Sequence, residues 1–157
     1  TNLFYEGIRA ATINDIGGIL ELIQPLETSG ILIKRSREQL ELEINFFSVI
    51  EKDGLVIACI ACIPDKISKK AEVACVAVSS EFRKSGLGDQ LLSAVELSAK
   101  KAGQEHLFIL TTRTSHWFME KGYSEQSIDF LPQHKQQHYP HDRQSIIMAK
   151  KLNQEKL

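Results

Sequence analysis

One short segment of the chain combines two glycines with two cations directly before an amphipathic stretch. It reads Arg83-Lys84-Ser85-Gly86-Leu87-Gly88 and follows an apolar run that ends at Val78. Glycines let a backbone approach a ligand closely, and the N–H groups at the start of a helix favour an anion. The segment therefore predicts a site that holds a pyrophosphate. It lacks the Gly-Lys-Ser/Thr ending of a P-loop and the Gly-x-Gly-x-x-Gly spacing of dinucleotide-binding folds.

Glu72 is the second candidate for chemistry, because it is an acid within the otherwise apolar run 71–78. An unpaired carboxylate is costly to bury, and burial favours the neutral form, which suits a proton acceptor. The alternative is a solvated glutamate at the start of a strand, and the residues alone leave both open. Cys75 lies in the same run without a histidine near it in the sequence. We expect it to pack rather than to act as a nucleophile.

Two other groups of metal-binding residue types are not expected to hold a metal. Cys59 and Cys62 are three positions apart within an apolar run, so on a strand they point to opposite faces. His134, His138 and His141 lie in a polar stretch without a further ligand at suitable spacing except Asp142. We predict a solvent-facing loop over residues 131–142.

The elements that must position these residues follow from periodicity, capping and turn signals. The expected order is β-α-α-β-β-β-α-β-α-β-β, a mixed sheet with helices on its faces. Strands are predicted at 8–10, 48–52, 55–63, 71–78, 107–110, 123–130 and 145–150. Helices are predicted after Thr12, which forms a capping box with Asp15, to a stop at Pro25, then from Ser36, from Leu87 to Ala102, and over 115–121.

The composition excludes several classes of protein. Of 157 residues, 43% are hydrophobic and 25% are charged, which argues against disorder. With 19 basic and 20 acidic residues the formal net charge is −1, so no broad nucleic-acid-binding surface is expected. Three cysteines, an odd number, favour a reduced, cytoplasmic setting, and no apolar run suggests a membrane span. We expect a single domain over residues 1–157, taken from the C-terminal part of a longer chain, with a flexible tail at 151–157.

Arg83-x-x-Gly86-x-Gly88, between the fourth strand and the third helix, resembles the acetyl-CoA signature of the GNAT N-acetyltransferases. Further blocks along almost the whole chain resemble the acetyltransferase domain of bacterial N-acetylglutamate synthases. These blocks are 9–16, 25–27 with 30–32, 35–40, 72–78, 110–113, 116–118 and 131–132.

The resemblance implies a fold, a co-substrate and a binding site for it. The fold is a mostly antiparallel mixed sheet of six to seven strands, splayed between the fourth and fifth, with helices on both faces. The co-substrate is acetyl-CoA, and no metal is implied. The residues implied to contact it are Cys75, Val76, Ala77, Val78, Arg83, Lys84, Ser85, Gly86, Leu87 and Gly88.

The resemblance also implies the acceptor, L-glutamate, and the residues around it. Glu72 matches the general base, and Thr111 matches a serine position assigned as the general acid. Arg35, Arg143 and Ser145 match residues that touch glutamate. From the residues alone, each arginine could be a solvated charge, and Thr111 a hydroxyl that bonds the backbone. Another amine acceptor, or a non-catalytic acyl-CoA-sensing module, stays open, as does a homo-oligomer of the full-length protein; no nucleic acid or membrane partner is expected.

Overall fold

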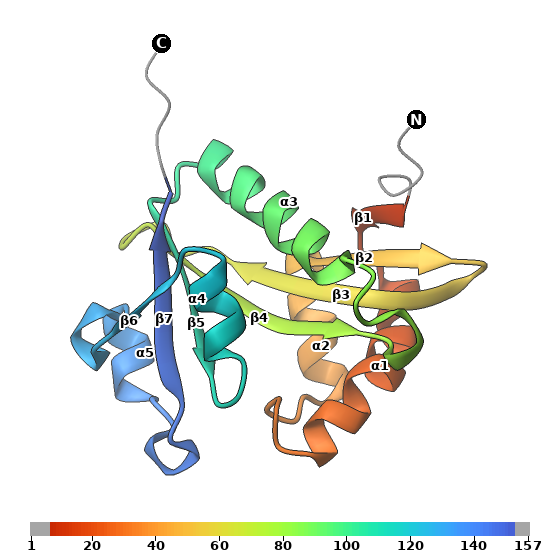
Figure 1. The fold of residues 1–157 in the computed structure, drawn as a ribbon, viewed down its shortest axis with the longest axis horizontal. Helices are drawn as coiled ribbons and strands as arrows, with labels where there is room; N and C mark the ends of the chain where they lie inside the picture. The colour runs from red at the N-terminus through yellow and green to blue at the C-terminus, as the bar shows by residue number, and fades with distance from the viewer. Residues whose placement is uncertain (1–6, 153–157) are drawn as a thin grey trace. The chain divides into compact units, whose positions relative to one another are not determined.

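The computed structural model describes residues 7–152, in which the chain forms seven strands and five α-helices (Figure 1). The strands are β1 (Ile8–Ala10), β2 (Phe47–Lys52), β3 (Leu55–Ile63), β4 (Lys70–Val78), β5 (His106–Thr111), β6 (Ser124–Gln126) and β7 (Ile146–Lys151). The helices are α1 (Ile16–Thr28), α2 (Arg37–Glu43), α3 (Leu87–Lys101), α4 (Ser115–Glu120) and α5 (Gln133–Gln137). None of these helices, within the described part of the chain, combines the length and apolar character needed to cross a membrane.

The strands form one mixed sheet in the order β1-β2-β3-β4-β5-β7-β6. β1 with β2, β2 with β3, β5 with β7 and β6 with β7 are antiparallel, whereas β4 and β5 are parallel. Parallel pairing joins only Lys70–Glu72 to His106–Phe108, although both strands continue beyond it. The predicted fold class, a mostly antiparallel mixed sheet of six to seven strands with helices on both faces, is confirmed. The short parallel pairing of β4 with β5 lies where the splay was predicted.

The chain divides into two compact units. The first comprises residues 1–62 and 75–95, and the second comprises residues 63–74 and 96–157. β4 and α3 each contribute residues to both units. The site residues predicted from the sequence are therefore shared between the units, and each unit positions its own set.

In the first unit, α1 packs closely against β3. Ile16, Ile19 and Ile23 form its buried face, as the periodicity predicts. Gly18 permits the close approach, since a Cβ there would lie 3.0 Å from the Val56 side chain. Residues 57–61 of β3 are all buried, which is typical of a strand covered on both faces.

The predicted capping box of Thr12 and Asp15 is present, and it caps a 3-10 turn, Ile13–Asp15, that leads directly into α1. The Thr12 N–H donates to Asp15 Oδ2 at 2.7 Å. Arg9 donates from both terminal nitrogens to the two Asp15 oxygens, each at 2.8 Å. Asp15 is buried, so this forked pair ties β1 to the helix start.

The second unit is built on β5, which pairs along its whole length with β7. Phe108, Leu131, Ile147 and Ala149 form a buried cluster on one face of these strands. Leu110, Ile128, Phe130 and Tyr139 pack against it. The segment after β6 therefore covers this face of the sheet.

Several predicted boundaries are wrong. α1 runs through Pro25 to Thr28, because proline lacks only its own N–H while its carbonyl still accepts from the Ser29 N–H at 3.1 Å. β6 ends at Gln126 rather than at residue 130, since Ile128–Phe130 form a 3-10 turn.

The predicted loop and tail also need correction. The stretch 131–142 contains α5, and Leu131 and Pro132 are buried, so only part of it faces solvent. Lys151 belongs to β7 and pairs with His106. Leu152 is buried and donates its N–H to Glu105 O at 2.8 Å, so the tail cannot start at residue 151. Residues 153–157 of the predicted tail lie outside the described residues.

Candidate active site

The predicted pyrophosphate site lies in the first unit, on the connection from β4 to α3. Gly86 has φ +86°, a left-handed conformation that favours glycine, and a Cβ there would meet no atom within 4 Å. The helical hydrogen bonds of α3 start with Gln90 N to Gly86 O at 3.0 Å. The N–H groups of Leu87 and Gly88 therefore have no acceptor within the helix, as at any helix start. This arrangement fits an anionic group.

The cations of this segment are placed beside that helix start. Arg83, Lys84 and Ser85 are all exposed. The Arg83 Nε donates to Val78 O at 3.2 Å, which ties the side chain back to the end of β4. Lys84 adopts φ +70°, so a non-glycine residue holds a strained turn here. The predicted residues 83–88 thus lie together at one exposed turn.

β4 has a kink at Cys75 within the first unit. Cys75 adopts φ +53° in the middle of the strand, where extended backbone is the rule. The Cys59 thiol, which is fully buried, donates to Cys75 O at 3.3 Å, and the Ala77 N–H bonds the Cys59 sulfur. Burial raises the pKa of Cys59 strongly, so this group stays a neutral donor. An interruption of this kind re-aims the backbone groups that follow it, here those of residues 76–78.

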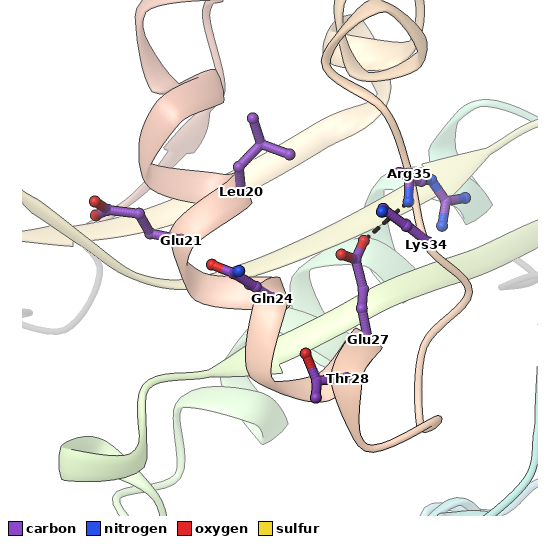
Figure 2. A pocket seen from close by; sticks show the side chains of 7 residues that line it. All are labelled: Leu20, Glu21, Gln24, Glu27, Thr28, Lys34 and Arg35. Carbon is purple, nitrogen blue, oxygen red and sulfur yellow. Dashed lines mark hydrogen bonds between the residues drawn. The ribbon is translucent and has the colours of Figure 1, made fainter.

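Arg35 lies beside a pocket of about 510 Å³ in the same unit (Figure 2). Its backbone N–H donates to Glu27 Oε2 at 2.9 Å, and its Nε donates to Glu43 Oε1 at 3.2 Å. The side chain is only 14% exposed, and its charge is close enough to Cys59 to lower the pKa of that thiol against the larger effect of burial. Arg35 is therefore a fixed, largely buried cation, whereas Lys34 and Arg37 are exposed, as predicted.

The pocket itself combines charges of both signs. Figure 2 shows the Glu27 carboxylate directed from α1 toward the segment that carries Lys34 and Arg35. The residues that line the pocket are Leu20, Glu21, Gln24, Glu27, Thr28, Lys34 and Arg35.

Glu72 lies in the second unit and is neither unpaired nor freely solvated. Its side chain is 16% exposed, and its Oε1 lies 2.9 Å from Lys135 Nζ. The sequence analysis missed Lys135 because it assigned residues 131–142 to a solvent-facing loop. The alternation of β4 places Glu72 on the face of Lys70, and its register partner on β5 is Phe108 of the buried cluster.

Thr111 ends β5 and is 6% exposed. The Thr114 N–H donates to Thr111 Oγ1 at 3.0 Å, and the two hydroxyl groups lie 2.5 Å apart. Strand alternation places Thr111 on the face opposite to Phe108, the register partner of Glu72. The hydrogen bonds of the Thr111 hydroxyl are both to Thr114, within its own turn.

Arg143 and Ser145 lie directly before β7, in the turn that follows α5. The Arg143 N–H donates to Pro140 O at 3.0 Å, and Gln144 adopts φ +56°. Tyr139 donates from its hydroxyl to Ser145 O at 2.7 Å and accepts from Ser145 Oγ at 3.2 Å. Tyr139 therefore anchors this turn to the cluster that covers the Glu72 face, a role that no local signal in the sequence indicates.

Two predictions about cysteine and histidine can be compared with the structure. Cys59, Cys62 and Cys75 are all free thiols. Between residues 7 and 152, no three His, Cys, Asp or Glu side chains gather as metal ligands. His134 instead lies 4.0 Å from Asp65, and His138 contacts the carbonyl of His134.

Residues 17–123 match the Acetyltransferase (GNAT) family, so the chain belongs to that family. It is 52% identical over 153 residues to the amino-acid acetyltransferase of Pasteurella multocida (strain Pm70) and 52% identical over 145 residues to that of Escherichia coli (strain K12). The matches cover 96% and 92% of this chain but only 34% and 33% of those proteins. The chain thus spans about a third of the length of these relatives.

Solved structures agree with this assignment. The N-acetylglutamate synthase from Neisseria gonorrhoeae, complexed with coenzyme A and N-acetyl-glutamate, superposes with a TM-score of 0.90 at 39% identity. That match covers 94% of this chain and 35% of the synthase. The same synthase complexed with coenzyme A and L-arginine superposes with a TM-score of 0.83 at 38% identity, over 94% of this chain and 33% of that one. The predicted resemblance is confirmed.

Proposed function

We propose that this chain transfers an acetyl group from acetyl-CoA to the α-amine of L-glutamate, the first step of arginine biosynthesis. The observation that carries the proposal is the similarity to the N. gonorrhoeae synthase, whose structure contains coenzyme A and N-acetyl-glutamate, at a TM-score of 0.90. The relatives called amino-acid acetyltransferases, 52% identical to this chain, support the same activity.

In this proposal the first unit binds the donor. The N–H groups at the start of α3 and the side chains of Arg83 and Lys84 hold the pyrophosphate of acetyl-CoA. Backbone groups of residues 75–78 hold the pantetheine arm, and one N–H polarises the thioester carbonyl, as in an oxyanion hole. The kink at Cys75 supports this role, since it interrupts the ordinary strand pattern where such a group is needed.

The acceptor is bound by forked cations and deprotonated by Glu72. Arg35 and Arg143, with Ser145, bind the two carboxylates of glutamate. Glu72 accepts a proton from the ammonium group, and the neutral amine nitrogen then bonds to the acetyl carbon. The nitrogen is positively charged after this attack and gives its extra proton to solvent as the amide forms, and Glu72 releases its own proton to solvent. The carbon–sulfur bond breaks, and CoA leaves as a thiolate that takes up a proton. We assign that proton to the Thr111 hydroxyl, which regains one from solvent.

A thiol-release assay with acetyl-CoA and a panel of amines tests the function. We expect L-glutamate to be the best acceptor, with glutamine and aspartate poor because they lack the second charge or the reach. Faster acetylation of ornithine, lysine or a polyamine would assign another acceptor to the chain. Binding of acetyl-CoA without thiol release for any amine would assign a sensing module. A cytoplasmic location and a homo-oligomer stay predictions.

A further inference from the structure

The ion pair between Glu72 and Lys135 is built into the second unit rather than formed by two loose surface side chains. The two charged groups are 2.9 Å apart, and their side chains are 16% and 31% exposed. Lys135 lies on α5, and its backbone N–H donates to Pro132 O at 2.9 Å, which closes the first turn of the helix. Gln136 Nε2 donates to Leu131 O at 2.8 Å, and Leu131 belongs to the buried cluster. The Lys135 ammonium group therefore lies beside the Glu72 carboxylate because α5 is held in place by these hydrogen bonds.

The other charged groups around this pair are engaged elsewhere. Lys70 shares the face of β4 with Glu72, but its ammonium lies over the Phe130 ring at 4.1 Å and donates to Phe130 O. His106, the register partner of Lys70 on β5, has a lowered pKa, chiefly because of burial and secondarily because of the Lys70 charge. His134 on α5 faces Asp65 at 4.0 Å.

One more cation lies near the edge of this face. Lys151 on β7 is the register partner of His106, and it is exposed. Among the described groups of β4, β5, β7 and α5, Lys135 is thus the cation whose ion pair with Glu72 the structure records directly.

We infer that Lys135 is a positioning residue for Glu72 and holds its carboxylate in the orientation that receives the incoming ammonium group. This inference rests on the proposed role of Glu72 as general base. A general base must lie within hydrogen-bond reach of the proton that it accepts, so a cation that fixes the Glu72 side chain acts on the proton-transfer step. Lys135 itself transfers no proton and forms no bond with the substrate.

The test compares four forms of the 157-residue chain: wild type, Lys135→Met, Lys135→Arg and Lys101→Met. Lys101 is an exposed lysine at the end of α3, so its variant removes one charge without touching Glu72. The constants kcat and KM for glutamate are measured separately, at saturating acetyl-CoA and at one pH, and the affinity for acetyl-CoA is measured by calorimetry.

We expect Lys135→Met to lower kcat by about tenfold with little change in the KM for glutamate, because a base without a fixed orientation is misplaced for proton transfer. Lys135→Arg, which keeps the cation, recovers most of kcat, and Lys101→Met leaves both constants unchanged. If Lys135→Met does not fold, as judged by circular dichroism, Lys135→Gln takes its place.

An unchanged kcat in a folded, uncharged Lys135 variant overturns the inference, whatever happens to stability. A higher KM for glutamate with an unchanged kcat also overturns it, and assigns Lys135 to carboxylate binding. Failure of the proposed function is seen separately, since wild type then does not acetylate glutamate. The same constants are in that case measured with the acceptor that reacts fastest.

Discussion

Protonation of Asp15 should lower the free energy of unfolding of this protein. The Asp15 carboxylate accepts a forked pair from Arg9 and a bond from the Thr12 N–H, at the junction of β1 and α1. The Arg9 hydrogen bonds, and after them the bond from Thr12, lower the pKa of Asp15 from 3.8 to about 2, although burial opposes this. The change we consider is Asp15→Asn, which removes the charge and keeps the shape.

The expected magnitude follows from that pKa. The interval between 3.8 and about 2 corresponds to about 2 kcal/mol at roughly 1.4 kcal/mol per pH unit. The Asp15 side chain is 8% exposed, but that of Arg9 is 37% exposed, so solvent screens part of the interaction. We therefore expect Asp15→Asn to lower the free energy of unfolding at pH 7 by about 1–2 kcal/mol.

The pH dependence has a definite sign. A carboxyl group whose pKa is lower in the folded state stabilises the fold above its unfolded pKa, and the contribution is lost as the pH falls through the folded value. The difference between wild type and Asp15→Asn should thus be complete above about pH 4 and shrink toward zero near pH 2. Other carboxyl groups titrate in both proteins and cancel.

Urea unfolding followed by circular dichroism, at several pH values, measures this difference. Glu51→Gln is the matched control, because Glu51 also pairs with Arg9, at 2.6 Å, but its side chain is 40% exposed. That variant should cost at most about 0.5 kcal/mol. An Asp15→Asn difference that is absent at pH 7, or equally large at pH 2 and pH 7, would refute the reasoning.

Three further predictions concern the site. Glu72→Gln should lower kcat by about 10²–10⁴-fold with little change in acetyl-CoA affinity, as measured by steady-state kinetics and calorimetry. A rate near that of wild type would assign Glu72 a structural role. Gly88→Val, which adds a side chain in the first turn of α3, should weaken acetyl-CoA binding at least about tenfold without unfolding the chain; unchanged affinity in calorimetry contradicts the pyrophosphate site. Arg35→Ala or Arg143→Ala should each raise the KM for glutamate at least about tenfold and spare acetyl-CoA binding, and an unchanged KM removes that arginine from the acceptor site.

For Arg35, the structure adds a contact that the sequence did not predict. The resemblance implies a carboxylate of glutamate as its partner. The structure adds Glu43, whose carboxylate accepts from Arg35 Nε at 3.2 Å and holds the side chain in place. The terminal nitrogens of a guanidinium form the fork that suits a second carboxylate. The pair with Glu43 therefore orients Arg35 for the proposed role.

The sequence by itself determined the features that depend on neighbours along the chain. Alternation and apolar runs predicted that each strand exists, and the capping box of Thr12 and Asp15 predicted the helical turn that leads into α1. The glycine turn before α3 was also readable, because a left-handed glycine and the N–H groups of a helix start are local properties. The family followed from the same local blocks.

Only the tertiary structure decided which side chains meet across the fold. Lys135 of α5 pairs with Glu72 of β4, and the Cys59 thiol of β3 pairs with the carbonyl of Cys75 on β4. Each pair joins residues from different elements, so its existence depends on how those elements pack and not on spacing along the chain. The stretch around Lys135 is polar and rich in histidine, which locally indicates solvent exposure. Leu131 is nevertheless buried, and the segment that follows it brings a cation to Glu72.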